Sequence, residues 1–81
     1  MTREEVENQV REIIVEKLQV APEKVTLDSK FDSDLGADSL DLVDLMMMLE
    51  DKFSLNISDE EAEKLKTVSD VVDYICSKSA A

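Results

Sequence analysis

The fold is decided by the stretch Gly36-Ala37-Asp38-Ser39-Leu40-Asp41-Leu42-Val43, which joins a loop exit to the most apolar helical pattern in the sequence. Asp38 suits the N-cap of that helix, because its carboxylate can accept from the backbone N–H groups two and three residues on. Asp41 adds a second carboxylate near the positive end of the helix macrodipole. Ser39 then takes the first helical position and caps nothing. We expect its hydroxyl to project into solvent beside amides that favour anions such as a phosphodiester.

The helix that follows, predicted from Ser39 to Phe53, carries two apolar stripes. At ~100° per residue one stripe forms the core face, and it consists of Leu42, Leu45, Met46, Leu49 and Phe53. The other stripe lies on another side, edged by acidic residues, and consists of Leu40, Val43 and Met47. One helix on one core cannot bury both. The second stripe is therefore either covered by the long preceding loop or exposed as an acid-edged docking patch.

Upstream of this helix the sequence predicts one more long helix and a long loop. Thr2-Arg3-Glu4-Glu5 reads as a capping box for a helix from Arg3 to Gln19, with an inward face of Val6, Val10, Ile13, Ile14 and Leu18. Pro22 favours a short helical turn from Pro22 to Val25. The connection over residues 20–37 is long for a compact domain. We expect the apolar residues of this loop to pin it to the core, namely Val25, Leu27, Phe31 and Leu35.

Downstream, two further helices are predicted. A second capping box, Ser58-Asp59-Glu60-Glu61, opens a short helix to about Leu65, in which only Ala62 and Leu65 face inward. So little apolar surface predicts the least stable element. The segment from Thr67 to Asp70 caps a last helix with the inward face Val68, Val71, Val72 and Ile75, and the tail from Ser77 to Ala81 should fray. The expected fold is an all-α four-helix bundle, three longer helices plus one short helix, in a single domain over residues 1–81.

The charge balance restricts the partners. Twenty Asp and Glu against nine Lys and Arg give a net charge of −11, which argues against nucleic acid and anionic membranes and favours basic protein partners. No apolar run approaches the ~18 residues of a membrane span, and the N-terminus lacks the order of a signal peptide. A lone Cys76 fits a reducing compartment. We expect a cytoplasmic protein, or one in an equivalent organellar compartment, without membrane insertion.

Catalytic and metal-binding patterns are missing from the sequence. The chain has no histidine, so neither a Ser-His-Asp triad nor a histidine metal site can be built, and no Gly-x-Ser-x-Gly elbow surrounds Ser39. The acidic loop over residues 28–34 fits an EF-hand poorly, because Lys30 falls at its third position and Ser33 at its glycine position. We expect no enzyme, no catalytic residue and no metal site beyond weak divalent binding.

Several segments together resemble the acyl carrier proteins of dissociated, type II fatty acid synthesis, and they are Phe31, residues 34–41, residues 49–53, Ile57, residues 59–64 and Thr67-Val68. In that family the serine of the Asp-Ser-Leu motif carries 4′-phosphopantetheine, so the resemblance assigns covalent attachment to Ser39. It implies that a holo-carrier-protein synthase transfers the group from coenzyme A, and that growing acyl chains are then held as thioesters. Asp38 would hold the helix end and assist synthase docking. This sequence departs from the family in Ser58, where many relatives have proline, in the methionine run Met46–Met48 and in Cys76.

The resemblance also implies a partner surface and a cargo pocket. Basic patches of the synthase and of fatty acid synthesis enzymes would meet a recognition face made of Leu40, Val43, Asp44, Met47, Glu50 and Asp51, extended by Glu60 and Glu61. The acyl chain would lie between the helix from Ser39 and the short helix, in a pocket of Phe31, Met46, Leu49, Ile57, Ala62, Leu65 and Val71. We expect a monomer. Polyketide, aminoacyl or peptidyl cargo remains an alternative, as does an unmodified acidic helical interaction module, which explains the charge but not Ser39.

Overall fold

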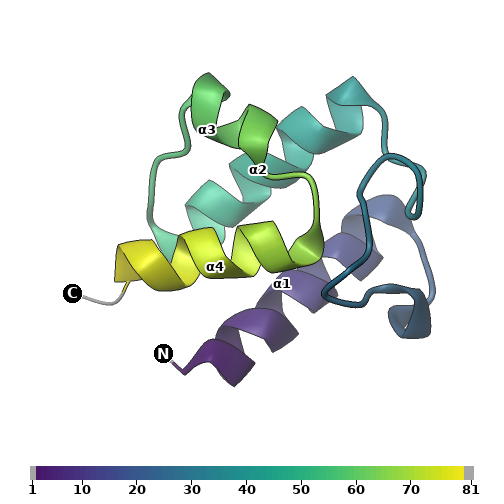
Figure 1. The fold of residues 1–81 in the computed structure, drawn as a ribbon, viewed down its shortest axis with the longest axis horizontal. Coiled ribbons are helices and arrows are strands. Elements are labelled where there is room, and N and C mark those ends of the chain that lie inside the picture. The colour runs from purple at the N-terminus through teal and green to yellow at the C-terminus, as the bar shows by residue number, and fades with distance from the viewer. Residues whose placement is uncertain (1, 80–81) are drawn as a thin grey trace.

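The structure is a computed structural model that describes residues 2–79. Within this range the elements are α1 (Arg3–Leu18), the short 3-10 helix η1 (Pro22–Lys24), α2 (Ser39–Phe53), α3 (Asp59–Lys64) and α4 (Val68–Ser79). α1 packs against both α2 and α4. Figure 1 shows α4 across the middle of the view, with α1 below it and α3 above it. The predicted helical bundle of three longer helices and one short helix, with a long loop before α2, is confirmed.

α1 begins where the sequence predicted and buries four of the five predicted inward residues, while the fifth, Leu18, is partly buried. The Glu5 N–H donates to Thr2 Oγ1 at 3.1 Å and the Thr2 N–H donates to Glu5 Oε1 at 3.3 Å, which completes the capping box. The buried residues of α1 are Val6, Val10, Ile13 and Ile14. The helix ends one residue before the predicted Gln19, because Gln19 adopts a left-handed conformation with φ 54°.

The long loop is pinned largely as predicted, with one error. Val25, Phe31 and Leu35 are buried, but Leu27 is 36% exposed. The loop turns Ser29 inward instead, because the Ser29 hydroxyl donates to the Lys24 carbonyl oxygen at 2.8 Å. A buried hydroxyl with such a partner costs little. A prediction from hydrophobicity alone therefore named Leu27 as the buried residue of this turn, whereas the buried residue is Ser29.

Backbone hydrogen bonds fasten this loop to the connection between α3 and α4. The Phe31 N–H donates to the Lys66 carbonyl oxygen at 3.1 Å, and the Val68 N–H donates to the Ser29 carbonyl oxygen at 3.1 Å. Lys30 and Thr67 form an isolated bridge between these two bonds. The loop before α2 and the end of α3 are thus held together by the main chain.

Gly36 turns the loop into α2. Its φ is 72°, a left-handed conformation that costs a residue with a Cβ atom roughly 1–2 kcal/mol. The Gly36 N–H donates to the Asp32 carbonyl oxygen at 3.2 Å, and the next N–H, of Ala37, donates to the Phe31 carbonyl oxygen at 2.8 Å. This tight turn directs the chain to the start of α2.

α3 is short and weakly packed. None of its six residues is buried, although Ala62 is half-buried and Leu65, which ends the helix, is buried. Both inward-facing predictions are confirmed. The predicted capping box is only half formed: the Glu61 N–H donates to Ser58 Oγ at 3.2 Å, but the Glu61 carboxylate accepts from the Ser58 hydroxyl rather than from the Ser58 N–H.

α4 shows the predicted cap and the predicted inward face. The Thr67 N–H donates to Asp70 Oδ2 at 3.2 Å and the Asp70 N–H donates to Thr67 Oγ1 at 3.1 Å. The inward residues Val68, Val71, Val72 and Ile75 are all buried.

The chain was predicted to fray from Ser77 onward. This prediction is wrong for residues 77–79, because α4 continues to Ser79. The Lys78 ammonium lies 5.4 Å from the centre of the Tyr74 ring one turn earlier, a cation–π contact that supports the last turn. The rest of the tail, residues 80–81, lies outside the described residues. No helix within residues 2–79 has the length and apolar character needed to cross a membrane.

Candidate functional site

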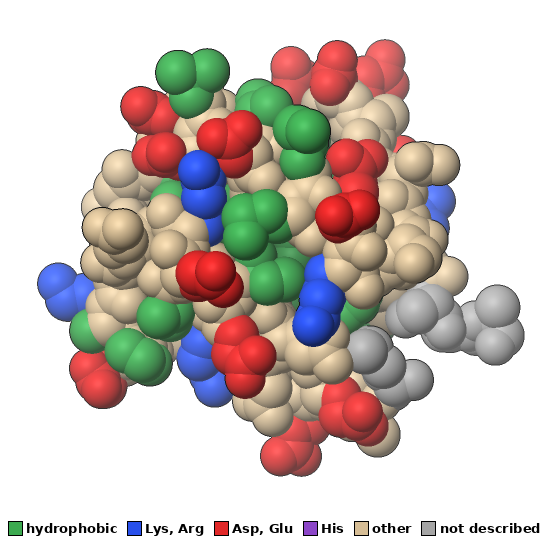
Figure 2. Space-filling model, turned by 180° about the vertical axis from the view of Figure 1, so that it is seen from behind, with side chains coloured by type: hydrophobic (Ala, Val, Ile, Leu, Met, Phe, Trp, Pro, Cys, Tyr) green, Lys and Arg blue, Asp and Glu red, His purple; other side chains and the backbone are tan. Residues whose placement is uncertain are grey.

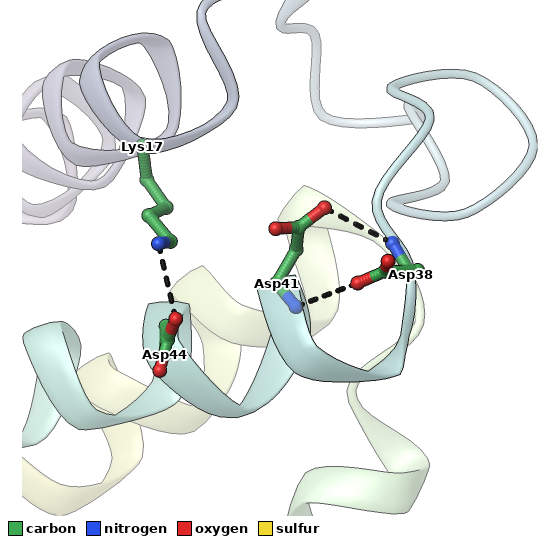
Figure 3. Close-up of polar contacts among 4 residues, drawn as sticks. All are labelled: Lys17, Asp38, Asp41 and Asp44. Atoms are coloured by element: carbon green, nitrogen blue, oxygen red, sulfur yellow. Dashed lines mark hydrogen bonds and ion pairs between the residues drawn. The ribbon is translucent and has the colours of Figure 1, made fainter.

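The start of α2 is fixed by two aspartates that cap each other. The Asp41 N–H donates to Asp38 Oδ1 at 2.9 Å, and the Asp38 N–H donates to Asp41 Oδ2 at 3.3 Å (Figure 3). The predicted N-cap role of Asp38 is confirmed. Asp41 does more than favour the positive helix end, because its side chain completes a reciprocal capping box.

Ser39 is the first residue of α2 and is exposed. The capping is carried out by its neighbours, so its hydroxyl is not needed to hold the helix start. Ser39 and Leu40 also contribute first-turn N–H groups, for which a helix supplies no acceptor of its own. An accessible hydroxyl beside such donors can accept a phosphoryl group and lie next to the resulting phosphodiester.

A groove of about 540 Å³ lies between α2 and α3 and reaches Ser39. It is lined by Ser39, Leu42, Val43, Met46, Met47, Glu50, Ile57, Asp59, Ala62 and Glu63. A hollow of about 460 Å³ lies next to it, because Leu42, Ala62 and Glu63 line both. Its other lining residues are Lys30, Phe31, Asp32, Ser33, Leu65 and Lys66. A long, thin group attached to the Ser39 hydroxyl would therefore find an apolar path along α2.

The structure brings most of the predicted pocket residues to these two cavities. Met46, Ile57 and Ala62 line the groove, and Phe31, Ala62 and Leu65 line the hollow. Leu49 and Val71 line neither, because both are fully buried in the core of the bundle. Leu42 is the residue that the sequence analysis missed. The helical wheel had placed Leu42 on the core face, but it lies in the first turn of α2 and is only half-buried, so it reaches both cavities.

The second apolar stripe of α2 is exposed. Leu40 is 75%, Val43 is 56% and Met47 is 59% exposed, so the loop does not cover them and the docking-patch alternative stands. Figure 2 shows hydrophobic side chains interspersed with acidic ones over one face of the molecule. Such an exposed patch is unusual for a protein without partners.

The acidic residues assigned to the recognition face differ in their surroundings. Asp51 and Glu60 are exposed and form no ion pair within residues 2–79. Asp44 is exposed but pairs with Lys17 of α1, with 3.1 Å between Lys17 Nζ and Asp44 Oδ2 (Figure 3). The helical wheel of α2 placed Asp44 at the surface correctly, but it could not show a partner on another helix.

Two of the assigned acids hold the backbone or a neighbouring side chain. Glu50 is half-buried and accepts from the Ile57 N–H at 2.7 Å, which ties the segment before α3 to α2. Hydrogen bonding with Tyr74 lowers the pKa of the Glu61 carboxyl, and a hydrogen bond with Ser58 lowers it further by a smaller amount. Both carboxylates thus have structural partners that sequence periodicity could not reveal.

Tyr74 of α4 sits at the centre of these contacts. Its hydroxyl donates to the Asn56 carbonyl oxygen at 3.1 Å. Hydrogen bonding with the Glu61 carboxylate, with a smaller contribution from burial, raises the pKa of Tyr74 to about 12. The hydroxyl carries one hydrogen and can serve one of these acceptors at a time. Tyr74 therefore links α4 to both the start of α3 and the segment before it.

The acidic loop before α2 uses its carboxylates locally. The Lys30 N–H donates to Asp34 Oδ2 at 2.8 Å, and the Ser33 N–H donates to Asp32 Oδ1 at 2.6 Å. Across residues 2–79 no group of three His, Cys, Asp or Glu side chains is arranged to hold a metal ion.

Comparison with known proteins agrees with this geometry. A family model described as "Phosphopantetheine attachment site" matches residues 8–75. A protein named acyl carrier protein from Wolinella succinogenes is 61% identical over 66 residues, which are 82% of this chain and 87% of that protein. A protein of the same name from Campylobacter hominis is 58% identical over 88% of this chain and 90% of its own length. Another, from Thermosynechococcus vestitus, is 52% identical over the full length of both.

Proposed function

The chain belongs to the phosphopantetheine-attachment family of acyl carrier proteins, and we propose that it carries growing fatty acyl chains as thioesters on a 4′-phosphopantetheine arm attached to Ser39. The observation that carries the choice of Ser39 is its geometry. Ser39 has an exposed hydroxyl that is not needed for capping, because Asp38 and Asp41 cap the helix, and it lines a groove. When bound, the arm supplies the thiol that forms thioesters.

The protein's part in its own modification is to present a nucleophile. The Ser39 oxygen would form the new bond to phosphorus while the nucleotide part of coenzyme A leaves. The base that takes the hydroxyl proton would belong to the holo-carrier-protein synthase, because the chain has no histidine and the carboxylates of Asp38 and Asp41 are occupied as caps. The chain is therefore a substrate of that transferase and a carrier, not an enzyme.

Docking to the synthase and to fatty acid synthesis enzymes would use the recognition face of α2. Leu40, Val43 and Met47 supply exposed apolar contacts, and Asp44 and Asp51 supply acid beside them. Glu60 extends the acid onto α3. With a net charge of −11, basic patches of partners would be attracted from a distance, which favours fast and weak encounters.

The cargo would lie in the groove between α2 and α3 and in the adjoining hollow. Met46 suits such a site, because an unbranched and polarizable side chain repacks readily around a guest. We propose that residues 1–81 form one carrier domain that works as a monomer in the cytoplasm. The lone Cys76 is in keeping with a reducing compartment.

Intact-protein mass spectrometry of the protein isolated from its own cells tests this function. We expect a mass increase corresponding to phosphopantetheine, and a further increase from saturated acyl chains that hydroxylamine removes, as it cleaves thioesters. An aminoacyl, peptidyl or polyketide mass on the same arm would keep the carrier and change the cargo. A population without any adduct would favour the unmodified interaction module.

A further inference from the structure

Lys17 of α1 places an ammonium group on the recognition face of α2. Its Nζ lies 3.1 Å from Asp44 Oδ2, within reach of a charge-assisted hydrogen bond. The other ion pairs within residues 2–79 join Arg3 to Glu7 and to Asp73, away from α2. Among the described residues, Lys17 is thus the basic residue that forms an ion pair with an acid of the recognition face.

Asp44 stands at the edge of the apolar stripe of that face, on the side where α1 lies. Leu40 lies four residues before it, and Met47 three residues after it, so all three share one side of the helix. Leu40 and Met47 are two of the three exposed apolar residues of the face. A partner that covers them brings its own basic side chain close to the carboxylate that Lys17 already contacts.

The exposure of the two side chains favours exchange. The Lys17 side chain is 27% exposed, whereas the Asp44 side chain is 57% exposed. The lysine stem is partly held by the protein, while the carboxylate stays open to solvent and to an incoming cation. Lys17 also lies in the last turn of α1, where free carbonyl groups attract a cation. When released from Asp44, the ammonium therefore keeps a favourable position at its own helix end.

We propose that Lys17 is an intramolecular competitor for basic partners at Asp44, so that docking requires an exchange of one cation for another. This inference rests on the proposed carrier function and adds the regulation of its docking surface. An arginine that grips both carboxylate oxygens must displace Lys17, whereas a partner that uses Asp51 or Glu60 need not. Lys17 would then tune which partners approach quickly, without touching Ser39.

The test is a double-mutant cycle on the association rate constant with a carrier-protein synthase at low ionic strength. Lys17→Gln should raise this constant by about two- to fivefold more than Lys24→Gln does, the range expected for removing an exposed ion pair. Lys24 is the matched control, because it is an exposed lysine without an ion pair in the described chain, so its loss changes the net charge equally. In an Asp44→Asn background the two lysine variants should behave alike.

Lys17→Arg keeps the competitor and should associate at nearly the rate of the unaltered protein. Thermal unfolding of each variant controls for changes in the bundle. Equal rates for Lys17→Gln and Lys24→Gln, or slower association of Lys17→Gln, would overturn the competition while leaving the carrier function intact. Failure of the synthase to modify every variant and the parent protein would contradict the proposed function and, with it, the surface for which Lys17 competes.

Discussion

At the start of α2, stability and chemistry are divided between neighbouring residues. Asp38 and Asp41 satisfy each other's N–H groups, so the helix begins at a defined residue whatever happens at Ser39. Ser39 is therefore held in position by its neighbours and can change chemically without loss of the cap. A residue that both capped the helix and accepted a bulky group could not keep the two roles apart, because its capping oxygen would become part of the phosphodiester.

This division predicts different effects for two changes at Asp38. Asp38→Ala removes the cap and should cost about 1 kcal/mol of stability, which lowers the melting temperature by about 4–8 °C in a domain of this size. Asp38→Asn keeps a capping oxygen and should stay close to the parent protein. Calorimetry of both variants measures this. A similar loss in Asp38→Asn would show that charge rather than capping is what stabilises the helix start.

At the scale of elements, α3 depends on polar contacts more than on burial. It has no buried residue of its own, yet Glu50 holds Ile57 just before it and Tyr74 reaches Asn56 and the Glu61 carboxylate. Polar contacts at the surface can be broken at lower cost than a packed apolar interface. The wall of the groove formed by α3 is thus the part of the bundle best suited to move.

The Tyr74 contact can be titrated directly, since the chain has one tyrosine and no tryptophan. Ultraviolet absorbance should give a pKa of about 12 for Tyr74, and Glu61→Gln should lower it toward the ordinary value. The folded state holds this proton more tightly than the unfolded state. The stabilisation that the protonated Tyr74 hydroxyl gives the folded state is therefore complete below pH ~10, and it is lost as the pH rises toward ~12. Between pH ~10 and ~12 the Tyr74→Phe variant should lose less stability than the parent protein does. An equal loss in both proteins would contradict the contact between Tyr74 and Glu61.

The groove between α2 and α3 predicts a dependence on cargo length. Each buried CH₂ group contributes ~0.8 kcal/mol before the cost of opening the site. The protein that carries a medium-length acyl chain on the arm at Ser39 should therefore melt at a higher temperature than the protein that carries a short one. Ala62→Phe would fill the wall shared by the groove and the hollow and should abolish this trend. Asp59→Asn, at the exposed polar edge of the groove, is the control that should retain it. A length dependence that survives in Ala62→Phe would place the cargo elsewhere.

At the scale of the whole molecule, the charge of −11 acts against the compact state. The molecule measures 33 × 25 × 19 Å, and the Debye length at 0.01 M salt is ~30 Å, so the excess acidic groups then repel one another across nearly the whole molecule. At physiological salt this length falls to ~8 Å. We expect the melting temperature to rise between these conditions. Matching ionic strength with sodium and with magnesium separates screening from ion binding, and a flat melting temperature would contradict the repulsion.

The sequence predicted what repeats along a helix and missed what joins separate elements. Periodicity placed the core face of α1 correctly and located the second stripe of α2, but it left open whether that stripe is covered or exposed. The burial of Ser29 in the loop was not predicted, because a hydroxyl that forms a hydrogen bond lies inside the loop where Leu27 was expected. The contacts of Lys17 with Asp44 and of Glu50 with Ile57 were not predicted either, for a related reason. They depend on how the packed elements meet in three dimensions, which local patterns do not contain.

The most direct test of the account is to locate the modified residue. The purified protein is incubated with coenzyme A, magnesium and a carrier-protein synthase, and fragment-ion mass spectrometry then maps the adduct. We expect one phosphopantetheine on Ser39, none in a folded Ser39→Ala variant, and normal modification of Ser33→Ala, which alters an exposed serine in the preceding loop. An adduct on another residue, or none with a synthase shown to be active, would contradict the central claim.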